Sequence, residues 1–254
     1  MRALARTYSP PDYAEVPTPD AALFLCAIDH GTGYRGSYLL DGEGPFHGSA
    51  LLWALGLRAE RHLPGTLSAA ALADIGTDGV AELFAIEDET VSGPGPRADL
   101  WRQLAAGMTE AYSGQAAVLL DAAGGRLGGP DGLLARLERF EAYSDPLRKK
   151  SFLLAKIAER RGWLQVDDPE QWEVCADSIL MRLALRAGLV RPAPVDELRE
   201  RTREALKQLA DEAGISPPVL DDLLWEFGRE DADLLGTAGG ELTEPSRTPG
   251  NTWY

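Results

Sequence analysis

The stretch YSDPLRKKSFLLAKIAERRG, Tyr143–Gly162, decides the fold class. Asp145-Pro146 marks a turn, and the residues that follow predict a helix over Lys150–Arg161. On both sides of this stretch, short segments with apolar residues at helical spacing are separated by Gly and Pro residues. No segment shows the long alternation of polar and apolar residues that is typical of a sheet sandwich. The sequence therefore predicts a mostly α-helical protein with few or no strands.

Several of the other predicted helices begin at Ser, Pro or Asp residues, which cap helix N-termini. One apolar segment, Ala21–Ile28, is either a strand or a buried helix, because its periodicity does not decide between them. The glycine-rich stretch that follows it, Asp29–Gly48, is expected to form turns and loop. The further predicted helices cover residues 49–63, 69–75, 97–112, 133–140, 170–188, 194–213 and 216–227.

The chain is predicted to consist of an arm, one domain and a tail. Residues 1–20 hold four prolines and are expected to form an irregular N-terminal arm. No break in composition marks a linker within residues 21–242, so we expect a single helical domain there, built as two lobes around a cleft. The polar residues 243–254 are expected to form a loosely tethered C-terminal tail.

The composition excludes several classes of protein. With 25 basic and 40 acidic residues the formal net charge is −15, which argues against a generic nucleic-acid coat and against adhesion to anionic membranes. The longest apolar run is too short to span a bilayer, and Met1–Tyr13 lacks the apolar core of a secretory signal. Cys26 and Cys175 lie in apolar runs and are predicted to be reduced core thiols. We therefore expect a cytoplasmic protein without a membrane partner, and leave its oligomeric state open.

Two carboxylates stand out in the second half of the chain. Asp145 begins a helix, where its side chain can cap free backbone N–H groups. Asp177 lies inside the predicted helix 170–188 among apolar residues, where an Asp has low helix propensity and a desolvation cost. It is either a structural Asp, which caps a neighbouring helix or pairs with an arginine, or a functional carboxylate.

Lysines and aromatic residues form a second group of candidates. Lys149 and Lys150 start an apolar helix, where partial burial can remove a proton and turn a lysine into a nucleophile. Surface lysines are nevertheless far commoner than buried ones. Phe152 and Trp172 lie nearby in the sequence and could stack on a planar base, although aromatic residues at such spacings are more often part of a core.

Sequence motifs for metal ions and cofactors are missing. There is no Walker-type loop, no dinucleotide-binding glycine fingerprint, no HExxH and no GxSxG. His30 and His47 flank the glycine-rich stretch, and a metal pair there is conceivable. A histidine hydrogen-bonded to the backbone is favoured, because metal sites need three or more ligands. We therefore predict neither a metal ion nor a cofactor.

Five segments carry a resemblance that spans most of the chain. They are FHGSALLWALGLRAE (46–60), PRADLWRQLAAGMTEAYSG (96–114), LLARLERFEAYSD (133–145), CADSILMRLALRAGL (175–189) and LDDLLWEFGRE (220–230). They are similar to segments of the queuosine 5′-phosphate N-glycosidases, a salvage family within the helix-hairpin-helix N-glycosylase superfamily. This resemblance implies a helical DNA-glycosylase-like fold and puts Asp177 on the family's catalytic carboxylate. Two stretches depart from the family: LLAKI (153–157) replaces Lys-Arg-Ala-Gln, and Ser178-Ile179 replaces Tyr-Arg.

A second resemblance covers mainly the C-terminal half. KSFLLAKI (150–157), DSILMRLALRAGLV (177–190) and AGISPPVLDDLLWEFG (213–228) are similar to segments of the archaeal 8-oxoguanine DNA glycosylases. The first of these looks like the helix that carries that family's catalytic lysine. The glycine hairpin typical of the DNA-binding members is absent before Lys149. The two resemblances agree on the chemistry and differ in the size of the substrate.

Both resemblances imply cleavage of an N-glycosidic bond through an oxocarbenium-like sugar. The first implies hydrolysis of a modified, 7-deazaguanine-type nucleoside 5′-monophosphate in the salvage of queuine. Asp177 would stabilise the cation or activate water, with Asp145 in a supporting role. The base would stack on Trp172 or Phe152, and the phosphate would lie near Lys149 or Lys150, or at a helix N-terminus. His47, in the glycine-rich stretch, is a further candidate for binding this small-molecule partner, and the sequence leaves open whether that loop closes over it.

Two alternatives remain open. The second resemblance implies a DNA glycosylase and lyase that removes 8-oxoguanine, with Lys150 attacking C1′ as a Schiff-base nucleophile and Asp177 assisting. DNA is a partner only under this alternative. The other alternative is a non-catalytic relative that binds a nucleotide and releases no base.

Overall fold

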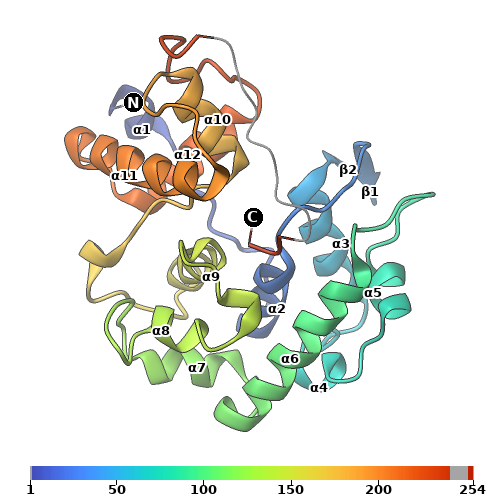
Figure 1. Cartoon of the computed structure of the whole chain (residues 1–254). Helices are drawn as coiled ribbons and strands as arrows, with labels where there is room; N and C mark the ends of the chain where they lie inside the picture. Colours follow the sequence, from blue (N-terminus) through green and yellow to red (C-terminus); the bar gives the residue numbers. More distant parts are fainter. Residues whose placement is uncertain (1, 241–250, 254) are drawn as a thin grey trace.

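The computed structural model describes residues 2–240 and 251–253 (Figure 1). Within them the chain forms twelve α-helices, two short 3-10 turns and one two-stranded antiparallel sheet. The prediction of a mostly α-helical protein with few strands is confirmed. Among the described helices, none combines the length and apolar character that a bilayer-spanning helix needs. The expected tail 243–254 lies outside the described residues, except for 251–253.

The helices form two lobes, the first around one large hydrophobic core and the second around two smaller hydrophobic clusters (Figure 1). The first lobe contains α2 (Pro19–Ile28), α3 (Gly48–His62), α4 (Ala69–Leu72), α5 (Thr77–Leu83), α6 (Pro94–Tyr112), α7 (Ala116–Ala123), α8 (Leu133–Leu137) and α9 (Lys149–Arg160). The second contains α1 (Arg2–Thr7), α10 (Ser178–Arg186), α11 (Val195–Ala213) and α12 (Pro217–Gly228). The expected two-lobed arrangement is therefore present.

Helix α2 lies at the centre of the first lobe, against α6 and α9. It begins at Thr18, whose Oγ1 accepts a hydrogen bond from the N–H of Ala21, and Pro19 occupies the first helical position. Every residue from Ala21 to Ile28 is buried, which explains why the segment shows no helical period. Each buried Leu, Ile or Phe of this kind stabilises the fold by ~1.5–3 kcal/mol. The apolar segment Ala21–Ile28 is thus part of a buried helix and not a strand, and the end of this helix places Asp29 at the junction of the lobes.

The glycine-rich stretch contains a β-hairpin that the sequence analysis missed. Strands β1 (Tyr38–Leu40) and β2 (Glu43–Phe46) pair antiparallel. Asp41 and Gly42 connect them with φ angles of 52° and 87°. Two positive φ angles are the geometry of a type I′ turn, for which Asp-Gly is a favoured sequence. The expectation of loop alone across Asp29–Gly48 was therefore wrong at this point.

Two other expectations need correction. The predicted helix 170–188 is α-helical only over Ser178–Arg186, because Asp177 caps its first turn. Before it, a 3-10 turn covers Pro169–Gln171, and residues 172–177 run in a non-helical conformation. The arm expected at residues 1–20 is not irregular throughout. It contains α1, which packs on α12 of the second lobe, and it ends in the first turn of α2.

Buried ion pairs join the two lobes. Asp145, just before α9, pairs with Arg199 of α11. Lys156 of α9 pairs with Asp221 and Asp222 of α12. All five side chains are less than a tenth exposed. Because such pairs tolerate little displacement when water is excluded, they fix how the lobes meet.

Candidate active site

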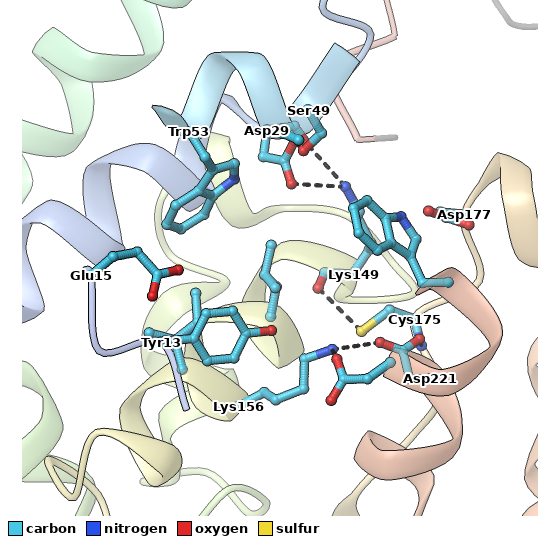
Figure 2. Close-up of a pocket in the computed structure, with 15 residues that line it drawn as sticks. Tyr13, Glu15, Asp29, Ser49, Trp53, Lys149, Lys156, Cys175, Asp177 and Asp221 are labelled. Carbon is cyan, nitrogen blue, oxygen red and sulfur yellow. Dashed lines mark hydrogen bonds and ion pairs between the residues drawn. The ribbon is translucent and has the colours of Figure 1, made fainter. Parts of the chain in front are cut away.

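A cavity of about 210 Å³, here called the inner cavity, opens at the junction of the lobes (Figure 2). The first lobe contributes the end of α2 and one side each of α3 and α9, and the second contributes α12 and the loop before α10. Its walls are largely apolar and include Trp53, Leu153 and Trp225. In Figure 2, Asp29 lies at one end of the cavity and Lys156 at the other.

A larger cavity of about 430 Å³, here called the outer cavity, lies beside the inner one. The two share six lining residues, among them Asp29, Lys149 and Asp177. The outer cavity is more polar and is lined by the loop after α2 and by Arg182 and Arg229. The three shared ionisable side chains therefore stand where an apolar cavity meets a polar one.

Asp177 lines both cavities and caps α10 instead of lying inside a helix. Its Oδ1 accepts hydrogen bonds from the N–H groups of Ile179 and Leu180, at 2.9 and 3.0 Å. Both bonds reach the same oxygen, so the cap does not use Oδ2. Burial raises the pKa of the Asp177 carboxyl, against the opposing effects of Lys149 and the backbone N–H groups. Capping and cavity lining are thus combined in one residue, although the sequence analysis treated them as alternatives.

Asp29 and Lys149 form an ion pair beside Asp177. Lys149 Nζ donates to the carbonyl oxygen of Asp29 at 3.0 Å and lies 3.5 Å from its Oδ2, and Ser49 donates to Oδ1 at 2.6 Å. Burial alone would raise the pKa of Asp29, but Lys149 and the Ser49 hydroxyl outweigh burial and lower it. Burial alone would lower the pKa of Lys149, but the carboxylates of Asp29 and Asp177 raise it. Asp29 is therefore ionised and Lys149 protonated near neutral pH.

Lys150, the nucleophile under the DNA alternative, lies outside the lining of both cavities. Its side chain is fully buried, and Nζ donates to the carbonyl oxygen of Ala27 at 2.6 Å and lies 3.1 Å from His30 Nδ1. Burial, together with the charges of Lys149 and Arg97, lowers the pKa of Lys150 to about 7. The lysine that reaches the cavities is its neighbour Lys149, so the assignment of Lys150 as the attacking group does not fit this geometry.

Asp145 also lies outside both cavities. Its carboxylate receives two bonds from the guanidinium of Arg199, at 3.0 and 2.7 Å. It also accepts the N–H groups of Leu147 and Lys149, each at 3.1 Å. Asp145 therefore binds a free N–H of the first turn of α9 as expected, but it precedes the helix by four residues and is not its N-cap residue, which is Arg148. A carboxylate that accepts four hydrogen bonds and lines neither cavity is not placed to orient water there. Its place indicates a structural role.

The expected stacking residues belong to the core. Phe152 and Trp172 are buried against each other, with ring centroids 6.1 Å apart, and neither lines a cavity. The aromatic walls of the inner cavity come instead from Trp53, Trp225 and Tyr13. His47 does line the outer cavity, at the N-terminal end of α3.

The far end of the inner cavity is a charged cluster. Lys156 Nζ donates to Asp221 Oδ2 at 2.7 Å and to Asp222 Oδ1 at 2.5 Å. Arg160 pairs with the other oxygen of Asp222, and the N–H of Cys175 donates to Asp221 Oδ1 at 2.9 Å. The carboxylates raise the pKa of Lys156 despite its burial. The cluster therefore offers both an ammonium donor and carboxylate acceptors.

Several of these residues were missed because no local pattern marks them. Asp29 had one available signal, a carboxylate placed directly after a buried apolar run and before glycines. Asp221 and Trp225 lie in a segment quoted for its resemblance, without any assigned role. Within the described residues, no three His, Cys, Asp or Glu side chains are grouped as metal ligands. No known protein-family model matches the chain, and a search of curated proteins gives no match either.

Proposed function

We propose that this protein is an N-glycosidase that hydrolyses the bond between base and sugar of a nucleoside 5′-monophosphate. The supporting observation is the group Asp29, Lys149 and Asp177 at the boundary of an apolar and a polar cavity. Two carboxylates whose pKa values are shifted in opposite directions are the usual basis of acid and base roles in such sites. The family resemblance suggests a 7-deazaguanine-type base and the salvage of queuine, and a cytoplasmic location suits such a substrate.

The inner cavity suits the base. Trp53 and Trp225 provide apolar walls for a flat ring, and Lys156 and Asp221 provide a donor and an acceptor for its polar edge. A base held there would place its bond to the sugar at the boundary between the cavities. The sugar would then lie beside Asp29 and Asp177.

The chemistry follows from this placement. Asp29, ionised, stabilises the positive charge that develops on C1′ as the bond to the base breaks. Asp177 takes a proton from a water molecule through Oδ2, and the water oxygen forms the new bond to C1′. The base leaves with the electron pair of the broken bond, and its nitrogen takes a proton from solvent. Asp177 then returns the proton of the attacking water to solvent, so that one water molecule is consumed in total. The products are the free base and the sugar phosphate.

Base release from queuosine 5′-monophosphate, followed by mass spectrometry, tests the proposal. We expect Asp177→Asn to reduce kcat by ~10²–10⁴-fold, because the amide cannot accept the proton of water. The matched control is Asp99→Asn, whose carboxylate is exposed and pairs with Arg102. Full activity of the Asp177 variant, or no release by the parent protein from this nucleotide or related ones, would contradict the proposal.

A second candidate function is the DNA glycosylase and lyase, because a lysine does reach the boundary of the cavities. Its nucleophile would be Lys149, which would have to lose its proton although Asp29 and Asp177 raise its pKa. Reduction by borohydride in the presence of an 8-oxoguanine duplex would trap a covalent complex that Lys149→Gln abolishes and Lys150→Gln retains. If the protein is instead a non-catalytic relative that binds a nucleotide, nucleosides bind and no base is released in either assay.

A further inference from the structure

Two arginines line the outer cavity without a carboxylate partner. Arg182 of α10 donates from Nη2 to the carbonyl oxygen of Gly228 at 3.0 Å. Arg229 follows directly after α12, and its guanidinium carbon lies 4.4 Å from the centroid of the Trp225 ring. Neither arginine takes part in an ion pair among the described residues.

Arg97 is also buried without an ion pair among the described residues, but its guanidinium donates to four backbone carbonyl oxygens, whereas that of Arg182 donates to one. Arg182 and Arg229 are thus poorly compensated, although the chain has a net charge of −15. Three other partly or fully buried arginines, Arg160, Arg186 and Arg199, each pair with an aspartate. In Arg182 and Arg229 the Nε atoms are buried and have no hydrogen-bond partner among the described residues. A half-buried guanidinium without a counter-charge is costly, and an anion in the cavity would remove that cost. The outer cavity is therefore prepared for a negatively charged group.

We infer that Arg182 and Arg229 bind the phosphate group carried by the sugar of the substrate. This inference rests on the proposed function for the position of the sugar at the boundary of the cavities. With the base in the inner cavity, a phosphate attached to the sugar extends into the outer one. Arginine suits this role, since its planar fork of N–H donors matches phosphate oxygens.

The position of these two arginines differs from the phosphate position expected from the sequence. Lys149 was expected to lie near it, but Lys149 Nζ is held by Asp29 at the boundary. Trp225 lines both cavities, and the guanidinium of Arg229 lies over its ring. A phosphate bound by Arg229 thus also fixes the position of the Trp225 ring, against which the base lies. Binding of the phosphate and binding of the base are therefore coupled.

Calorimetric titration with ribose 5-phosphate tests the site without any need for base release. We expect Arg182→Gln and Arg229→Gln each to weaken binding by ~10–100-fold, the loss of one or two charge-assisted hydrogen bonds. The control is Arg201→Gln, an exposed arginine of α11 paired with Glu197, which should bind like the parent. Because the two site variants are independent, failure of one to fold leaves the other as the test. Unchanged affinity in a folded site variant would overturn the inference.

A second titration identifies the source of the phosphate. Ribose 5-phosphate carries a terminal phosphate, and a thymidine tetranucleotide carries diesters only. Tighter binding of the first supports a nucleotide substrate, and tighter binding of the second supports a nucleic-acid backbone, provided that both depend on Arg182 and Arg229. Arginine-dependent binding without base release from any nucleotide would overturn the proposed hydrolysis and leave the phosphate site standing.

Discussion

Lys149 lies between two carboxylates, and its charge acts on the pKa of both. It lowers the pKa of Asp29 and opposes the rise that burial causes in the pKa of Asp177. If Asp177 accepts a proton from water, activity is lost as pH falls through its pKa. Because that pKa is raised, the acid limb of kcat/KM should lie above the usual range of an Asp.

Neutralising Lys149 should move this limb further. In Lys149→Gln both carboxylates lose their cation, so their pKa values rise and the acid limb shifts to higher pH, by ~1 unit or more for a buried neighbour. The measurement is the pH profile of kcat/KM for base release. The control is Lys207→Gln, which removes a lysine paired with Glu173 outside both cavities. An unmoved acid limb in an active Lys149 variant would show that another group controls it.

Asp177 could be identified from the sequence, but its neighbours in the fold could not. Asp177 was singled out because an Asp among apolar residues needs a partner, and the structure supplies that partner as the first turn of α10. The choice between Lys149 and Lys150 could not be made from the sequence, because adjacent residues on a helix differ by about 100° in direction. Only the packing of α9 on α2 decides which of them is buried.

At the scale of elements, the C-terminal end of α2 is held by cations rather than by a glycine cap. Lys150 donates to the carbonyl of Ala27, and Arg97 donates to those of Ile28 at 2.6 Å and His30 at 2.7 Å. Cations at this end of a helix satisfy its last carbonyls and complement its dipole. Lys150 therefore acts as a positioning residue for Asp29, the next residue after α2.

The buried Lys150 predicts a pH dependence of stability. Its folded pKa of about 7 lies below the unfolded value near 10.4, so between these values the unfolded chain holds a proton that the folded chain has lost. The free energy of unfolding should then rise with pH through this window, by ~2 kcal/mol from pH 7 to 9 for this group alone. Urea unfolding at the two pH values should show that Lys150→Met lacks this gain relative to the parent. A similar slope in both proteins would mean that Lys150 stays protonated in the fold.

Most helices could be predicted, and the exceptions share a physical cause. Helices such as α9 and α11 show apolar residues at helical spacing on one side, so the period is visible. Helix α2 is buried on all sides and shows no period. The start of α10 was placed too early because the segment before it contains apolar residues, Trp172, Val174 and Cys175, that are buried in the cores of the lobes without being helical. Such burial is set by the tertiary fold.

At the scale of the whole molecule, the candidate site depends on how the lobes meet. Asp29 and Lys149 come from the first lobe, whereas Trp225 and Asp221 come from the second. Two lobes were expected from the sequence, but the residues that face each other across the junction are far apart in the chain. No local pattern can pair them, which is why the inner cavity was assigned the wrong aromatic residues.

The pair of Asp145 and Arg199 should be one of the main determinants of that junction. Both side chains are almost completely buried, at 1% and 2% exposed, so removing one leaves the other charge in a dry environment. Arg199→Met should lower the free energy of unfolding by ~3–5 kcal/mol, and Asp145→Asn should also destabilise the fold. In the double variant no uncompensated charge remains, so its loss should be smaller than the sum of the two single losses. Chemical denaturation of the four proteins gives this coupling as a double-mutant cycle. Additive losses would mean that the pair contributes no coupling across the junction, and the position of the lobes would then depend on Lys156 and its two aspartates.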